Sequence, residues 1–244
     1  MEVLGELVAR DRRSRRPALS IVGTDRSISY HDFCTTAYKA GNVLRYLGVR
    51  AGSTVAVAGS VGPQPVWAFY GAAQLGAVTR FVGDVDDRPI AETTRVLLLP
   101  VDDEEGVEPP AGTKLAAYGG APARPTTLHW EKELWSENPA VHPTEVAPSD
   151  PLLSAGTTYT HGEVLDAARA TVDRFGLDAD SRVVVRGSLS EPGVVVGGLV
   201  APILAGGTVV VPDGGSSAGD VAVVDTSTDP APEPRACRPA DVPL

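Results

Sequence analysis

The sequence of 244 residues predicts an α/β fold with two related halves, each a mainly parallel β-sheet flanked by helices. The first observation is an internal repeat: segments 48–61 (GVRAGSTVAVAGSV) and 176–189 (GLDADSRVVVRGSL) are identical at seven of fourteen positions. The second is the alternation of short β-branched runs with amphipathic stretches of crossover length, which is typical of parallel strands joined by helices. Each copy is therefore predicted to run helix, strand, helix, strand.

The periodicity of the repeat places these elements. Apolar residues spaced by three and four predict one helix from Phe33 to Leu47 and another from Val164 to Phe175. Four β-branched runs predict strands at Val55–Ala58, Val78–Val82, Val183–Val185 and Val209–Val211.

The stretch from Gly193 to Val211 has no charged residue, as a membrane span would. Pro202 lies in its middle, and the Gly206-Gly207 pair follows. These residues favour a buried helix, a turn and a strand. We therefore expect no membrane span.

Residues 1–225 are predicted to form one domain. Its first half covers residues 1–100, a connecting segment covers 101–150, and its second half covers 151–225. Residues 226–244 are rich in Pro and have too little apolar content to pack, so we expect a disordered tail there.

The region between the copies is predicted to hold strands at Arg95–Leu99 and Lys114–Tyr118 and a short helix around His129–Ser136. This helix carries Trp130 and Trp135. Buried packing is the commoner role for such side chains, so we expect the Trp pair to pack rather than to stack on a ligand.

Composition narrows the class of protein. The formal net charge is −10, the sequence pI is about 4.8, and three lysines stand against 31 acidic residues. This balance favours the hydrated surface of a halophilic protein over that of an ordinary acidic one, and it argues against nucleic-acid binding. Cys34 lies in a helical pattern and Cys237 in a Pro-rich stretch, so we expect no disulfide framework and a reducing compartment. Neither has a Cys or His at metal-ligand spacing, so we expect no metal site. The N-terminus does not read as a secretion signal, so a cytoplasmic location is expected.

The stretch SAGTTYTHGEV, residues 154–164, places small and hydroxyl-bearing residues between an apolar run and a helix. Backbone amides and hydroxyls in such a loop can hold a nucleotide phosphate. Phosphate-binding loops usually also carry Lys or Arg, and this one has neither.

The order of these pieces resembles the first half of the large N-terminal domain of the adenylate-forming, AMP-binding enzymes: acyl- and acetyl-CoA synthetases, luciferase and nonribosomal peptide adenylation domains. The matching pieces include RPALSIVGTDRSISYHDF, AGNVLRYLGVRAGSTVAVAG, AFYGAAQLGAVTRFV and SDPLLSAGTT. The family's large domain has two similar α/β halves, as the repeat would require. The resemblance covers about residues 1–213 and implies a truncated, degenerate member.

By this resemblance, Ser154, Gly156, Thr157 and Thr158 match the front of the family's phosphate loop. In the family a Pro-Lys-Gly segment follows, but here Tyr159 comes next and that segment with its Lys is missing. We therefore expect a vestigial loop, with binding of ATP or AMP and magnesium weak if it occurs.

The next helix begins with a capping-box pattern, Thr160 followed by Glu163. Ser29 begins the related pattern in the first copy, in which His31 lies near the equivalent of His161. A His in this position, without a Cys or carboxylate partner at catalytic spacing, is expected to be surface or capping structure. No catalytic residue is predicted.

Further departures from the family weigh against ligase chemistry. The resemblance implies an aromatic-Gly-x-Thr-Glu motif for magnesium, an Asp for the ribose and a C-terminal catalytic Lys, and none has a counterpart here. Glu191 lies near the family's acyl-site His, where a carboxylate would repel an anionic substrate. Arg169 and Arg186 are the cations expected, at most, to reach a triphosphate.

Three functions stay open. The sequence favours an acyl-CoA synthetase-like protein that has lost its AMP-forming acid-thiol ligase activity and acts as an interaction or regulatory pseudoenzyme. The alternatives are a weak binding module for adenylate, acyl group or CoA, and one part of a split ATP-dependent acyl-CoA ligase. For the first function we expect self-association or a protein partner, which would cover apolar surface near Val194–Val211 or the Val221–Val224 strand.

Overall fold

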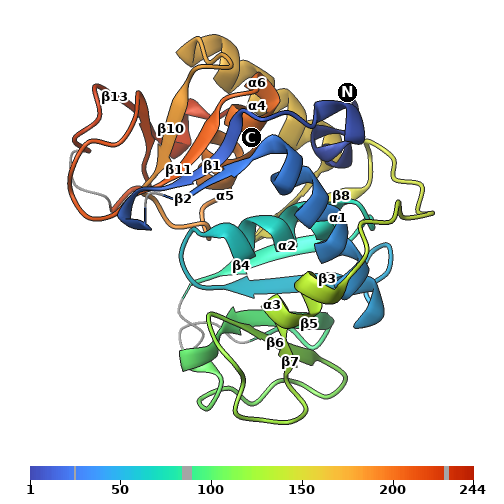
Figure 1. Cartoon of the computed structure of the whole chain (residues 1–244). Helices are drawn as coiled ribbons and strands as arrows, with labels where there is room; N and C mark the ends of the chain where they lie inside the picture. The colour runs from blue at the N-terminus through green and yellow to red at the C-terminus, as the bar shows by residue number, and fades with distance from the viewer. Residues whose placement is uncertain (25, 84–89, 228–230) are drawn as a thin grey trace.

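The computed structural model describes residues 1–24, 26–83, 90–227 and 231–244, which form two β-sheets with helices packed against them (Figure 1). Helix α1 (Tyr30–Tyr46) packs on the six-stranded sheet, and helix α2 (Pro63–Ala73) packs on the seven-stranded sheet. The two helices also pack on each other, so they join the sheets through a shared hydrophobic core.

The seven-stranded sheet has the order β7-β6-β5-β3-β4-β8-β9 and is parallel except for the β8–β9 pair. Its strands are β3 (Thr54–Ala58), β4 (Val78–Val82), β5 (Thr94–Pro100), β6 (Lys114–Tyr118), β7 (Leu128–His129), β8 (Pro151–Ala155) and β9 (Thr157–Thr160). The β-branched and leucine runs of the central strands β3, β4 and β5 are buried on both faces, as parallel strands require.

The six-stranded sheet has the order β13-β12-β10-β11-β1-β2 and is parallel except for the β1–β2 pair. Its strands are β1 (Pro17–Ile21), β2 (Arg26–Ser29), β10 (Arg182–Val185), β11 (Thr208–Val211), β12 (Val221–Val223) and β13 (Arg235–Cys237).

The predicted α/β class with two mainly parallel sheets is confirmed, but the sheets do not coincide with the predicted halves. The N-terminal hairpin β1–β2 pairs with β11 of the second half, and the hairpin β8–β9 pairs with β4 of the first half. Sequence periodicity cannot show this exchange, because the partner of an edge strand is chosen by long-range packing. The two halves are therefore interlocked through one core.

The two long helices begin at side-chain caps. Ser29 accepts a hydrogen bond from the Asp32 amide before α1, and Thr160 accepts one from the Glu163 amide before α4 (His161–Phe175). Helix α4 ends at Gly176, whose φ of 57° is the left-handed conformation that glycine adopts freely.

The uncharged segment folds inside the protein, as expected. It forms α5 (Pro192–Val195), a π-helical turn (Val196–Val200), α6 (Ala201–Ala205) and then β11. Pro202 lies in the first turn of α6, where its missing amide breaks the α-helical hydrogen-bond pattern least. In the part of the chain that the structure describes, no helix is long and apolar enough to cross a membrane.

The prediction of a disordered tail is wrong for residues 231–244, while residues 228–230 lie outside the described ranges. Strand β13 extends the six-stranded sheet beside β12, and Cys237 and Val242 are buried. The strand adds backbone hydrogen bonds that a count of apolar residues does not register.

This C-terminal segment also covers the surface that was expected to be exposed. Residues Val194–Val196 and Val221–Val224 are at most 4% exposed, because β13 pairs with β12 and a 3₁₀ turn at Pro239–Asp241 packs on α5. The expected apolar docking face is therefore absent from this part of the fold.

The short helix α3 (Trp130–Ser136) confirms the predicted position but divides the Trp pair. Trp130 is fully buried, whereas Trp135 is 80% exposed. Packing is confirmed for Trp130 only.

Candidate functional site

The four predicted phosphate-loop residues lie in a tight β-hairpin rather than in an open loop. Ser154 lies in β8 opposite Thr158 of β9, and Gly156 forms the tip between the two strands. Gly156 has a φ of 84°, which permits this abrupt reversal, and the tip is exposed. The structure therefore brings Ser154, Gly156, Thr157 and Thr158 together at one edge of the seven-stranded sheet.

The hairpin arranges its backbone differently from a phosphate-binding nest. In a nest, successive amides point into one concavity, often at a helix N-terminus. In an antiparallel ladder, the amides of successive residues point alternately to either side of the strand. The pairs Ser154–Thr158 and Ala155–Thr157 belong to such a ladder. The amides of this segment therefore do not converge on one point.

The predicted capping box separates the hairpin from helix α4. Thr160 Oγ1 accepts a hydrogen bond from the Glu163 amide over 3.2 Å, and Glu163 Oε2 accepts one from the Thr160 amide over 2.8 Å. The Thr160 amide and hydroxyl both donate to this carboxylate and hold the pKa of Glu163 below its usual value. The first amides of α4 are thus directed to the cap and to the preceding chain, where Asp150 and Pro148 accept from His161 and Gly162.

His161 is a buried structural group, not a surface residue. Its Nδ1 accepts a hydrogen bond from the Leu4 amide over 3.1 Å, and its side chain is fully buried. Burial lowers its pKa to about 4, partly offset by Asp150, so the ring is neutral near pH 7. This bond ties the N-terminal 3₁₀ turn (Leu4–Val8) to the start of α4.

The counterpart of His161 in the first half is Tyr30, not His31. The amide of Tyr30 donates to the Arg16 carbonyl and that of His161 donates to the Asp150 carbonyl, and each acceptor directly precedes a Pro that begins a strand. Hairpin β8–β9 is therefore the structural counterpart of hairpin β1–β2. The sequence carried this signal in the shared Pro-x-Leu-Ser at 17–20 and 151–154.

Arg186, a cation expected to reach a triphosphate, is engaged in a buried ion pair. Its guanidinium donates to both carboxylate oxygens of Glu233, over 2.8 and 2.7 Å, and to the carbonyls of Gly214 and Ser216. Burial opposes ionisation of Glu233, but hydrogen bonds from Arg186 and the Ala218 amide outweigh it and keep the pKa of this carboxyl low. Sequence reasoning missed this pair because the two residues are far apart in sequence and Glu233 was assigned to the tail.

The other expected cation, Arg169, is also engaged. It pairs with Asp166 on the surface of α4, and its Nη2 donates to the Met1 carbonyl. Glu191, placed near the family's acyl-site position, precedes α5 and accepts backbone bonds from Val194 and Val195 through its carbonyl. Arg169 is therefore not a free cation at the hairpin.

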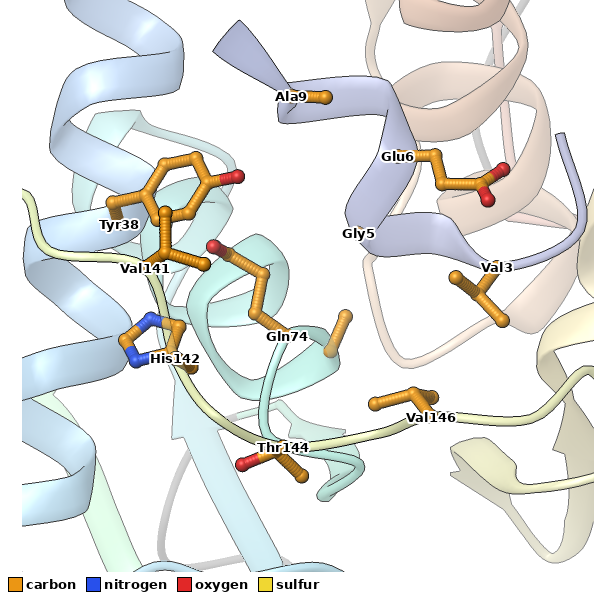
Figure 2. A pocket seen from close by; sticks show the side chains of 11 residues that line it. Val3, Gly5, Glu6, Ala9, Tyr38, Gln74, Val141, His142, Thr144 and Val146 are labelled. Carbon is orange, nitrogen blue, oxygen red and sulfur yellow. The ribbon is translucent and has the colours of Figure 1, made fainter.

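A cavity of about 230 Å³ lies where the connecting segment approaches the N-terminal turn (Figure 2). His142 stacks on Tyr38 there, with ring centroids 5.9 Å apart, and burial lowers its pKa. Gln74 donates to the carbonyls of Ala37 and Tyr70, while its Oε1 has no partner among the described residues. The lining is mostly apolar, and the hairpin does not contribute to it. The lining residues are Val3, Gly5, Glu6, Ala9, Tyr38, Ala73, Gln74, Val141, His142, Thr144 and Val146.

Within residues 1–24, 26–83, 90–227 and 231–244, no group of three or more His, Cys, Asp or Glu side chains could hold a metal ion. Cys34 and Cys237 are buried free thiols, and burial raises their pKa values to about 11 and about 12. Neither thiol is poised for nucleophilic chemistry at neutral pH.

Comparison with known proteins agrees with this fold. Residues 7–85 match the family model described as AMP-binding enzyme. A search of curated proteins finds no match to the chain.

Solved structures of adenylate-forming enzymes superimpose on most of the chain. The anthranilate CoA ligase AuaEII, in complex with anthranoyl-AMP, is 17% identical with a TM-score of 0.77, and the match covers 91% of this chain and 49% of that one. The N-terminal domain of FACL13 from Mycobacterium tuberculosis is 17% identical with a TM-score of 0.73 and coverages of 92% and 63%. The nonribosomal peptide synthetase FmoA3 is 22% identical with a TM-score of 0.71 and coverages of 86% and 22%.

The described chain thus resembles the N-terminal domain of the adenylate-forming enzymes in fold, and its residues 7–85 match the AMP-binding enzyme family. It spans between about a fifth and two thirds of the length of these three relatives.

Proposed function

We propose that this chain, which resembles acyl-CoA synthetases, does not catalyse ATP-dependent acyl activation by itself and acts as an interaction or regulatory protein. The observation that carries the proposal is the closed hairpin at Ser154–Thr158, where the resemblance implies a phosphate loop with a Lys. Adenylation needs cations or oriented amides around the triphosphate, since negative charge must be stabilised in the transition state.

The charge distribution supports this proposal. The hairpin contributes no cation, and the two candidates from elsewhere, Arg169 and Arg186, are paired with Asp166 and Glu233. Each charge-assisted hydrogen bond that is not made forfeits about 1.5 to 3 kcal/mol, or roughly ten- to a hundredfold in affinity. The net charge of −10 adds a general repulsion of anionic ligands.

A weak binding module is the second candidate. Thr157 and Thr158 are exposed at the hairpin tip, where their hydroxyls can donate to a phosphate or adenylate without a cation. Binding of this kind, with or without magnesium, would be compatible with loss of the ligase step.

A thermal shift panel separates the two candidates. The purified chain is heated with millimolar Mg-ATP, AMP and acyl-CoA, in dilute buffer and in molar KCl, since an acidic surface of halophilic type would need salt to fold. The pseudoenzyme proposal predicts no rise in Tm with any ligand in either buffer. A concentration-dependent rise with ATP or AMP that disappears in Thr157→Val would establish the binding module instead.

An interaction role also requires a partner or self-association. The apolar face first considered for it is buried under the C-terminal segment, so the interaction is proposed without it. Static light scattering at several protein concentrations tests self-association directly. If the mass stays that of a monomer at every concentration, the interaction role requires a separate protein as partner.

A further inference from the structure

The exposed indole of Trp135 is not accounted for by packing. It is 80% exposed at the end of α3, while Trp130 at the start of the same helix is fully buried. Large exposed aromatic side chains often mark binding sites. Trp135 lines a cavity of about 440 Å³, within the roughly 300 to 1,000 Å³ usual for small-molecule sites.

The cavity lies between elements of both sheets. Strand β2 of the six-stranded sheet contributes Ile28, while α3, which follows β7 of the seven-stranded sheet, contributes Leu134 and Trp135. Helix α1 supplies further lining residues, and helix α2 supplies Gln64 and Trp67. These apolar and aromatic side chains suit a flat, largely apolar ligand.

Four lining side chains carry a polar atom shielded from solvent that has no hydrogen-bond partner among the described residues: Thr35 Oγ1, Gln64 Oε1, Trp67 Nε1 and Glu131 Oε2. The Glu131 oxygen lies 3.7 Å from His129 Nε2, whereas no such neighbouring charge is found for Gln64 Oε1 and Trp67 Nε1 among the described residues. Trp67 is 6% exposed, and Gln64 lies three residues before it on the same face of α2. An indole N–H donates and an amide oxygen accepts, so a donor and an acceptor one helical turn apart both lack a partner among the described residues. Such unsatisfied groups each cost about 1 to 3 kcal/mol, which a complementary ligand would recover.

The charges around the cavity balance. Arg26 and Lys39 line it together with Asp32 and Glu131. Asp32 accepts from the Ser29 hydroxyl, and Glu131 accepts from the Gly119 amide. Two cationic and two anionic side chains in one lining give no net advantage to an ion, whose desolvation would be uncompensated, so they favour an uncharged ligand.

We infer that this cavity binds an uncharged planar heteroaromatic molecule with an N–H donor next to a carbonyl or ring-nitrogen acceptor. The ring of the ligand stacks on Trp135, and its N–H donates a hydrogen bond to Gln64 Oε1. Its carbonyl or ring nitrogen accepts a hydrogen bond from Trp67 Nε1–H. The inference is independent of the proposed function, because the cavity shares no residue with the β8–β9 hairpin.

Calorimetric titration of the full chain with 2-quinolone tests the inference, because this neutral bicyclic probe has its N–H next to its carbonyl. N-methyl-2-quinolone is the matched comparator, since it keeps the ring and the acceptor but lacks the donor. We expect saturable binding of 2-quinolone and at least about tenfold weaker binding of the N-methyl compound. Failure of 2-quinolone to bind at millimolar concentration, or equal affinities for both compounds, would overturn the inference.

Two variants locate the binding. Trp135→Ala removes the exposed ring and should lower the affinity for 2-quinolone about tenfold. Tyr46→Ala is its matched control, because Tyr46 is also an exposed aromatic, at 78%, but does not line this cavity. Gln64→Met keeps the side-chain length without the acceptor and should abolish the preference for 2-quinolone over its N-methyl analogue. Unchanged affinity in Trp135→Ala, with far-UV circular dichroism showing a folded protein, would contradict the proposed site.

Discussion

Arg186 and Glu233 form a buried ion pair in which the guanidinium donates to both carboxylate oxygens over 2.8 and 2.7 Å. The side chain of Glu233 is fully buried and that of Arg186 is 9% exposed. The pair joins the end of β10 to the C-terminal segment that carries β13. It therefore removes a cation from ligand binding and fixes the segment that covers the six-stranded sheet.

Removing one partner of this pair should destabilise the protein strongly. Glu233→Ala leaves the Arg186 charge buried without compensation, which costs about 3 to 5 kcal/mol in comparable pairs. Urea denaturation measures the loss in the free energy of unfolding. Asp180→Ala is the control, because Asp180 pairs with Arg16 on the surface and should cost no more than about 1 kcal/mol. Equal losses in both variants would contradict the structural role of the buried pair.

Protonation of His161 should lower the free energy of unfolding as the pH decreases from about 6.5 to about 4. Its folded pKa, about 4, lies below the ordinary 6.5, so in this range the unfolded chain binds a proton that the native state excludes. The contribution of neutral His161 to the free energy of unfolding is fully present above pH 6.5. At most about 3 kcal/mol of it is lost by pH 4.

The measurement is the free energy of unfolding at several pH values, compared between the natural chain and His161→Gln. Gln can still accept from the Leu4 amide but does not titrate in this range. The difference between the two proteins should therefore shrink or invert as pH falls. Parallel pH profiles would exclude His161 as the titrating group.

Thr160, the capping residue between the hairpin and α4, should contribute measurably to the stability of the protein. Thr160→Ala removes the acceptor for the Glu163 amide and should cost about 1 kcal/mol in thermal or urea unfolding. Ser29→Ala removes the equivalent bond to Asp32 before α1 and should cost a similar amount, since the two caps are structural counterparts. A loss below about 0.3 kcal/mol in Thr160→Ala would be too small for the capping role.

Both cysteines should be inert in the native protein. Burial raises the thiol pKa of Cys34 to about 11 and that of Cys237 to about 12, so at pH 8 roughly one thiol in a thousand or fewer is ionised. Labelling with a chromogenic disulfide reagent should be at least about a hundredfold slower in buffer than in guanidinium chloride. Rapid native labelling of Cys237 would show that the C-terminal segment opens readily.

Local patterns predicted most of the fold. The β-branched run Val78–Val82 and the segment Lys114–Tyr118 form strands with the predicted bounds, because their residues favour strands and are buried where they pair. The exchange of hairpins and the position of β13 were not predicted, since these depend on pairing between residues distant in sequence. Periodicity reports which face of an element is apolar, not which element covers it.

The candidate site could be predicted in part. The spacing of Thr160 and Glu163 predicted the cap, because capping depends on residues close in sequence. The absence of a Lys near Thr157 is visible in the sequence itself. That the residues before Thr160 close into a ladder could be recognised only from the structure, as could the engagement of Arg186 by Glu233. Both features depend on contacts that no local pattern encodes.

The most direct test of the proposed loss of ligase activity is carboxylate-dependent exchange of labelled pyrophosphate into ATP by the purified chain. The assay is run in low and molar salt, with a range of aromatic and aliphatic carboxylates and magnesium. Since the hairpin offers neither a cation nor converging amides to a triphosphate, we predict exchange no greater than in the absence of protein. Exchange that depends on both carboxylate and protein, and that falls in Thr157→Val, would contradict the account.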